Sequence, residues 1–110
     1  MLNKKCRGLK KAGDIMDISV LYQDIARLGA KYNADKIVLF GSRARGDYRQ
    51  RSDIDIAVYG MPLPQQAAFW MDLEDLPTLL KIDVNHVIPR MNEAFLKNIE
   101  REGVSLYEKN

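Results

Sequence analysis

Length, composition and charge narrow what this chain can be. With 110 residues, 46% of them apolar, it has the size and hydrophobic content of one small domain with a buried core. It contains no apolar run of membrane-spanning length, and its single cysteine, Cys6, excludes an internal disulfide. No membrane association is expected, and a cytoplasmic location is the default expectation.

The N-terminal segment has a charge balance unlike the rest of the chain. Its first 13 residues hold five of the 17 basic residues and no acidic one, which leaves 12 basic and 15 acidic residues elsewhere. Such a segment could bind nucleic acid. A disordered basic extension over residues 1–15 is the simpler interpretation, with the folded domain spanning residues 16–110.

The first half of the domain begins with a predicted helix from Asp17, a suitable cap, to about Tyr32. Apolar residues recur along it at helical spacing. Residues 36–40 follow as a nearly continuous apolar run, which is typical of a strand buried on both faces. Residues 54–59 predict a second strand, ended by a Gly-Met-Pro sequence.

The second half continues the alternation. Residues 64–76 predict a helix in which Phe69 belongs to the buried stripe and Met71 lies outside it. A strand over residues 79–88, a helix over 91–102 and a short final strand follow. The order of elements predicts an α/β (α+β) architecture, with one mixed β-sheet flanked by helices.

Asp53 and Asp55 form an Asp-x-Asp pair at the start of the second strand. Alternate side chains of a strand share a face, so the two carboxylates point one way while Ile54 and Ile56 fill the other face. Carboxylates this close repel, and the pattern is typical of oxygen-rich sites for Mg²⁺ or Mn²⁺. Solvated aspartates on an edge strand are the alternative.

The Gly41-Ser42 turn follows the first strand. Gly41 permits close approach of a ligand to the backbone, and Ser42 is predicted to cap a short helix whose free amides would point at an anion. Arg43 and Arg45 add cationic donors suited to phosphate. Taken alone, the segment could also be an ordinary junction between a strand and a helix.

Together these features resemble a known signature. An apolar-Gly-Ser sequence, ten intervening residues and Asp-Ile-Asp-Ile resemble the DNA polymerase β-like nucleotidyltransferase superfamily. The fuller form Gly-Ser-Arg-Ala-Arg-Gly…Ser-Asp-Ile-Asp is similar to its smallest members, the minimal nucleotidyltransferases (MNT), from about Asp17 to the C-terminus. The resemblance implies that Gly41 and Ser42 bind the nucleoside triphosphate, and that Asp53 and Asp55 bind metal.

The resemblance also implies a third carboxylate on a neighbouring strand, and Asp83 is the candidate. Alternation faces it away from its apolar neighbours, so a strand beside Asp53 and Asp55 would bring the three carboxylates within metal-bridging reach. Two Mg²⁺ ions, or Mn²⁺ in their place, would then polarise the α-phosphate and stabilise the leaving pyrophosphate. A strand-end aspartate bonded to a turn is the alternative for Asp83.

The acceptor is expected to come from another chain, because 110 residues leave no room for template or acceptor domains. No nucleic-acid template is expected. The resemblance implies an antitoxin that transfers AMP from ATP to a tyrosine of a helical toxin of the HEPN family (higher eukaryotes and prokaryotes nucleotide-binding), in a hetero-oligomer. Two alternatives stay open: a non-catalytic antitoxin that acts by occlusion, and an aminoglycoside-type nucleotidyltransferase of small molecules.

Overall fold

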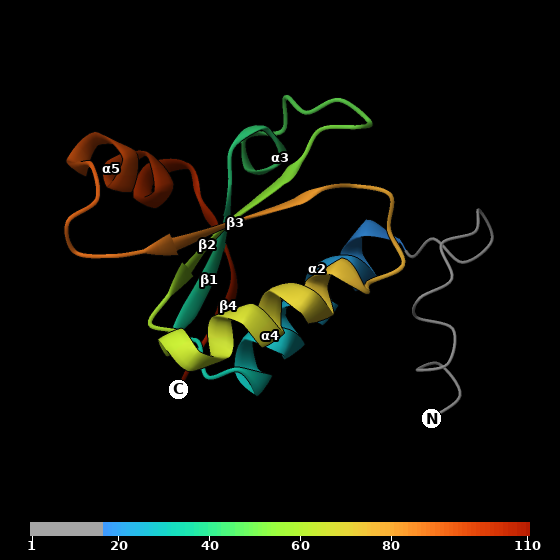
Figure 1. Ribbon diagram of the computed structural model, residues 1–110. Coiled ribbons are helices and arrows are strands. Elements are labelled where there is room, and N and C mark those ends of the chain that lie inside the picture. Colours follow the sequence, from blue (N-terminus) through green and yellow to red (C-terminus); the bar gives the residue numbers. More distant parts are fainter. Residues whose placement is uncertain (1–16) are drawn as a thin grey trace.

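The computed structural model describes residues 17–110, which fold into a four-stranded mixed sheet with helices on both faces (Figure 1). The predicted α+β architecture is therefore confirmed. The basic extension expected over residues 1–15 lies outside the described residues. In chain order, the elements are α2 (Ile18–Lys31), β1 (Lys36–Phe40), α3 (Ser42–Arg45), β2 (Ile54–Tyr59), α4 (Leu63–Glu74), β3 (Ile82–Val87), α5 (Glu93–Glu102) and β4 (Val104–Glu108).

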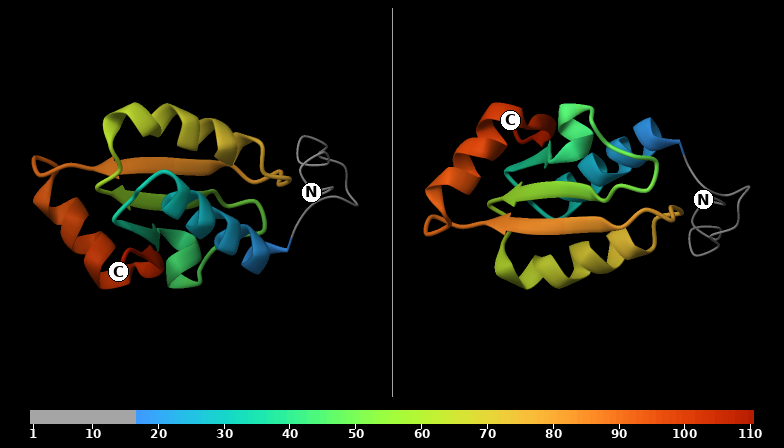
Figure 2. Two further views of the ribbon diagram at one scale, coloured as in Figure 1. Left: turned by 90° about the horizontal axis from the view of Figure 1, so that it is seen from below. Right: turned by 90° about the horizontal axis from the view of Figure 1, so that it is seen from above.

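The strand order in the sheet is β3-β2-β1-β4. Strand β1 pairs antiparallel with β2 and β4, whereas β2 and β3 are parallel. Helices α2 and α4 lie on one side of the sheet, and α3 and α5 lie on the other (Figure 1). In the left view of Figure 2, seen from below, α2 lies in front of the strands. In the right view, seen from above, α2 lies behind them. Between residues 17 and 110, no helix is long and apolar enough to cross a membrane.

Helix α2 forms where its cap and apolar spacing predict it. The Asp17 side chain accepts a hydrogen bond from the Ser19 amide at 3.2 Å, which satisfies one of the free donors at the helix start. Leu21, Ile25 and Leu28 form the buried face. Burial of this stripe against the sheet supplies most of the stability that an isolated helix of this length lacks.

Strand β2 is buried on both faces, because each face of the sheet carries its own core. Ile54, Ile56 and Val58 pack in the larger core beneath α2 and α4. On the other face, Ala57 packs with Ile99 of α5 in a smaller core. By alternation, the side chain of Asp55 lies on this second face. It belongs to the start of β2, at the end of the sheet that α5 leaves uncovered (Figure 1).

Helix α4 has the rotation about its axis that the sequence predicts. Phe69 is fully buried, whereas Trp70 and Met71 are 51% and 61% exposed. The ring of Phe69 also makes an edge-to-face contact with Tyr32, with centroids 6.2 Å apart.

Strand β3 begins later than the predicted range of 79–88. It starts at Ile82, and Leu79 is 72% exposed in the preceding loop. The Leu80 amide donates to the hydroxyl of the buried Thr78 at 3.1 Å, so a side chain rather than a strand satisfies this part of the backbone. The loop therefore projects an apolar side chain beside the start of β3.

Substitutions at two nearby residues of α4 test how this helix packs on the sheet. Phe69→Ala is expected to lower the free energy of unfolding by about 3–5 kcal/mol, because it leaves a cavity in the larger core. Met71→Ala is expected to change it by less than about 1 kcal/mol, because that side chain is largely solvated. Urea titration of both variants gives the comparison, and equal losses would contradict the packing of α4.

Candidate active site

The predicted site residues meet at the end of the sheet where β1 ends and where β2 and β3 begin. In the strand register, Asp55 lies opposite Phe40 on β1 and opposite Asp83 on β3. Gly41 follows Phe40 directly, so Asp55 stands between the glycine turn and the third carboxylate.

Gly41 is required by two features of its position. Its φ is +77°, a left-handed conformation that L side chains rarely adopt. A Cβ at this position would lie 2.5 Å from Oδ2 of Asp55, well inside van der Waals contact. The missing side chain therefore leaves room for the Asp55 carboxylate to lie against the backbone of the turn.

The short helix α3 starts differently from the prediction. Gly41, not Ser42, occupies the N-cap position, and no side chain caps the helix. Ser42 is the first helical residue, because the turn needs a left-handed φ that only glycine adopts easily. The first helical hydrogen bond of α3 runs from the Ala44 amide to the Gly41 carbonyl, at 3.1 Å. The amides of Ser42 and Arg43 come before this bond in the chain, at the open start of the helix.

The other two predicted carboxylates, Asp53 and Asp83, affect the pKa of Asp55. Burial raises the pKa of Asp55 above its ordinary value, and the negative charges of Asp83 and Asp53 raise it further. A hydrogen bond with Asp83 acts in the same direction, and the positive charge of Arg45 opposes it. Asp55 and Asp83 thus form a close pair of carboxyl groups, while Asp53 is exposed in the loop directly before β2.

A divalent cation fits this donor set, because hard carboxylate oxygens suit Mg²⁺ or Mn²⁺ and a bound cation would relieve the repulsion that raises the Asp55 pKa. As the side chains of residues 17–110 stand, no three His, Cys, Asp or Glu residues converge into a ready metal site. Asp55 and Asp83 would hold the ion, with Asp53 as the third ligand. The metal site therefore stays a prediction.

Arg43 holds the loop between α3 and β2. Its Nε donates to the carbonyl of Ser52 at 3.0 Å, and its Nη2 donates to that of Gln50 at 3.1 Å. The guanidinium also lies over the ring of Tyr48, 4.7 Å from the centroid. These contacts fix the segment that leads to Asp53, so Arg43 shapes the site through the loop in addition to its predicted role toward phosphate.

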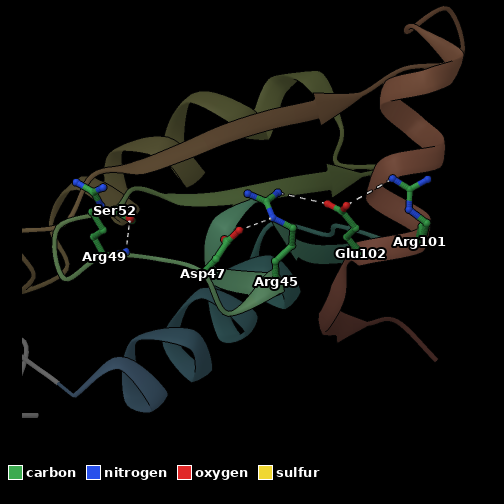
Figure 3. A network of polar contacts seen from close by, with 6 residues as sticks. All are labelled: Arg45, Asp47, Arg49, Ser52, Arg101 and Glu102. Atoms are coloured by element: carbon green, nitrogen blue, oxygen red, sulfur yellow. Dashed lines mark hydrogen bonds and ion pairs between the residues drawn. The ribbon is translucent and has the colours of Figure 1, made fainter.

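Arg45 links the site to α5 (Figure 3). Its Nε lies 3.2 Å from Oδ2 of Asp47, and its Nη1 lies 3.4 Å from Oε1 of Glu102. Arg101 approaches the other carboxylate oxygen of Glu102 at 3.5 Å. Arg45 is thereby held at the carboxylate cluster, where its charge lowers the pKa of Asp55.

Sequence reasoning missed Glu102 and the loop carbonyls. Glu102 lies 57 residues from Arg45, and only the packing of α5 on the sheet brings the two together. No local pattern signals such a contact. For the contacts of Arg43 with the loop carbonyls, the sequence offered only a weak signal. Arg43 and Tyr48 are close in the sequence, and their side chains can stack.

The structure sets an aspartate pair against a glycine turn on a mixed sheet, as the resemblance to nucleotidyltransferases implies. The sequence profile of the polymerase beta nucleotidyltransferase family matches residues 23–110, and the chain therefore belongs to that family.

Relatives with the same core carry more specific names. A protein of Methanocaldococcus jannaschii, provisionally named protein adenylyltransferase MJ0128, is 37% identical over 97 residues, covering 86% of this chain and 96% of the relative. A toxin–antitoxin crystal structure with AMP-PNP has a TM-score of 0.60 at 21% identity, over 81% of this chain and 74% of that one. The structure of a tri-AMPylated Shewanella oneidensis HEPN toxin in complex with an MNT antitoxin has a TM-score of 0.55 at 18% identity. The match covers 83% of this chain and 72% of that one. These two structures show the fold.

Two glycines with left-handed backbone provide a matched test of the turn. Gly46 has a φ of +92° and nothing within 4 Å of an added Cβ, unlike Gly41. Gly46→Ala is expected to cost about 1–2 kcal/mol of stability through its backbone alone. Gly41→Ala is expected to cost about 1–3 kcal/mol more, because its methyl group displaces Asp55. Urea titration measures both, and equal costs would contradict the contact.

The repulsion at Asp55 predicts a gain in stability on neutralisation. Because the folded-state pKa of Asp55 is raised, its contribution to stability falls as pH rises from the ordinary value of 3.8 through the folded pKa. Asp55→Asn should therefore raise the urea midpoint at pH 7 in metal-free buffer. Asp75→Asn at the exposed end of α4 is the control, and a lower midpoint for Asp55→Asn would refute the like-charge arrangement.

Proposed function

We propose that this chain is an antitoxin that transfers AMP from ATP to a tyrosine of a HEPN-type toxin and thereby neutralises it. The observation that carries the proposal is the packing of Asp55 between Gly41 and Asp83, since it sets a phosphate-approachable turn beside paired carboxylates. The relative named as a protein adenylyltransferase and the AMPylated toxin complex support a protein acceptor.

Each group of site residues would have a separate role in the transfer. Gly41 and Ser42 would cradle the triphosphate, because the turn lacks a side chain and its first amides precede the helical ladder. Arg45 would add positive charge beside the cluster. Asp53, Asp55 and Asp83 would hold two Mg²⁺ ions, which supply charge neutralisation of the triphosphate and acidify the attacking hydroxyl.

The reaction is an in-line displacement at the α-phosphorus. The tyrosine oxygen forms the new P–O bond while the bond to the oxygen that bridges to the β-phosphate breaks, and pyrophosphate leaves with that electron pair. Asp83 would accept the phenol proton, since its pairing with Asp55 places it in the carboxylate cluster. The products are an AMP–tyrosine phosphodiester and pyrophosphate.

A paired aspartate substitution tests whether catalysis neutralises the partner. The full chain is incubated with a purified HEPN-type toxin, ATP and Mg²⁺, and the toxin mass is measured. The wild type should add one or more AMP units. Asp53→Asn/Asp55→Asn should reduce the addition by at least about a thousandfold, because electrostatic stabilisation of the transition state is lost.

Asp35→Asn makes the same chemical change at an exposed residue directly before β1, at the opposite end of that strand from Gly41, and should leave the addition unchanged. Protection of cells by the double variant without AMP addition would contradict the enzymatic proposal and favour occlusion. Transfer to an aminoglycoside by the chain alone would favour the small-molecule alternative.

A further inference from the structure

A cavity of about 690 Å³ opens beside Asp53, between two loops at the same end of the sheet. One loop leads from α3 into β2, the other leads into β3, and the first turns of α2 close the back. We call this cavity the interloop pocket. Its lining includes Ile18, Leu21, Tyr48, Arg51, Leu79 and Lys81, together with Asp53.

The walls of the interloop pocket differ in chemistry. Ile18 and Leu21 form an apolar back wall, and the exposed Leu79 lies on the loop before β3. Arg51 and Lys81 are exposed and form no ion pair within the described part of the chain. Because Asp53 is the sole acidic residue of the lining, the pocket suits a ligand with an apolar body and negative charge nearby.

The topology relates this pocket to the reaction. In an in-line transfer, the attacking and leaving oxygens lie on opposite sides of the α-phosphorus. The proposed triphosphate cradle lies at the end of β1, on one side of β2, whereas β3 lies on the other side. Residues 78–81 of the pocket lead directly into β3, and Asp53 borders both the pocket and the carboxylate cluster.

We infer that the interloop pocket receives the acceptor: an aromatic hydroxyl side chain of a protein segment that has acidic neighbours. The ring would lie against Leu79 and the apolar back wall, with its hydroxyl directed past Asp53 toward the carboxylate cluster. Arg51 and Lys81 would bind the acidic neighbours. The inference rests on the proposed function, since it names the surface that selects the acceptor.

A binding experiment tests the inference without requiring catalysis. The backbone amides of the full chain are followed by NMR during titration with acetyl-Asp-Tyr-Asp-amide and, separately, with acetyl-Lys-Tyr-Lys-amide. The acidic peptide should cause saturable shifts in residues 48–53 and 78–81, and the basic peptide should cause none there. Arg51→Gln/Lys81→Gln should weaken binding of the acidic peptide about tenfold, which corresponds to ~1.4 kcal/mol.

Arg90→Gln/Lys109→Gln is the matched control, because it removes the same two charges at the opposite end of the sheet and should leave binding unchanged. Equal shifts with both peptides, or none in these loops, would overturn the inference.

A third titration uses the non-hydrolysable ATP analogue AMP-PNP with Mg²⁺. Shifts centred on the interloop pocket instead of residues 41–45 would assign it to the nucleotide and would also overturn the inference.

The two proposals fail in different ways. Transfer of AMP to the toxin, with no peptide binding in the interloop pocket, would refute the assignment of this pocket to the acceptor. The proposed function would still stand. Binding of the acidic peptide without AMP transfer would leave a peptide site on a chain that lacks the proposed activity.

Discussion

The strand register at the end of the sheet is the constraint on which the site depends. Antiparallel pairing of β1 and β2 sets Asp55 beside the glycine turn, and parallel pairing of β2 and β3 sets Asp83 on its other side. A slip of one residue would turn the carboxylates into the apolar core. Ile54 and Ile56, buried beneath α2 and α4, therefore fix the carboxylates on the opposite face.

This register holds like charges together where the surrounding protein disfavours them. Burial and two neighbouring carboxylates raise the pKa of Asp55, and Arg45 offsets only part of that effect. Such repulsion lowers the stability of the unliganded fold, and it persists in proteins where function requires it. Arg45 is itself held by Asp47 and Glu102, so the last turn of α5 contributes to the electrostatics of the site.

Much of this arrangement could be predicted from local sequence patterns. The spacing of Leu21, Ile25 and Leu28 predicts α2, and the Asp-x-Asp alternation predicts a shared face for the carboxylates. The cap of α3 could not be predicted correctly, because the turn needs the left-handed φ of Gly41. The link to Glu102 and the interloop pocket arise from packing between distant segments, which no local pattern encodes.

The central claim is that Gly41 and the paired carboxylates form one site for nucleotide and metal. Its most direct measurement is a crystal structure of the full chain with Mn²⁺ and AMP-PNP, in which anomalous scattering locates the metal. Anomalous density is predicted beside Asp55 and Asp83, with the triphosphate against the glycine turn. Metal density remote from both carboxylates, or a triphosphate bound away from Gly41, would contradict the claim.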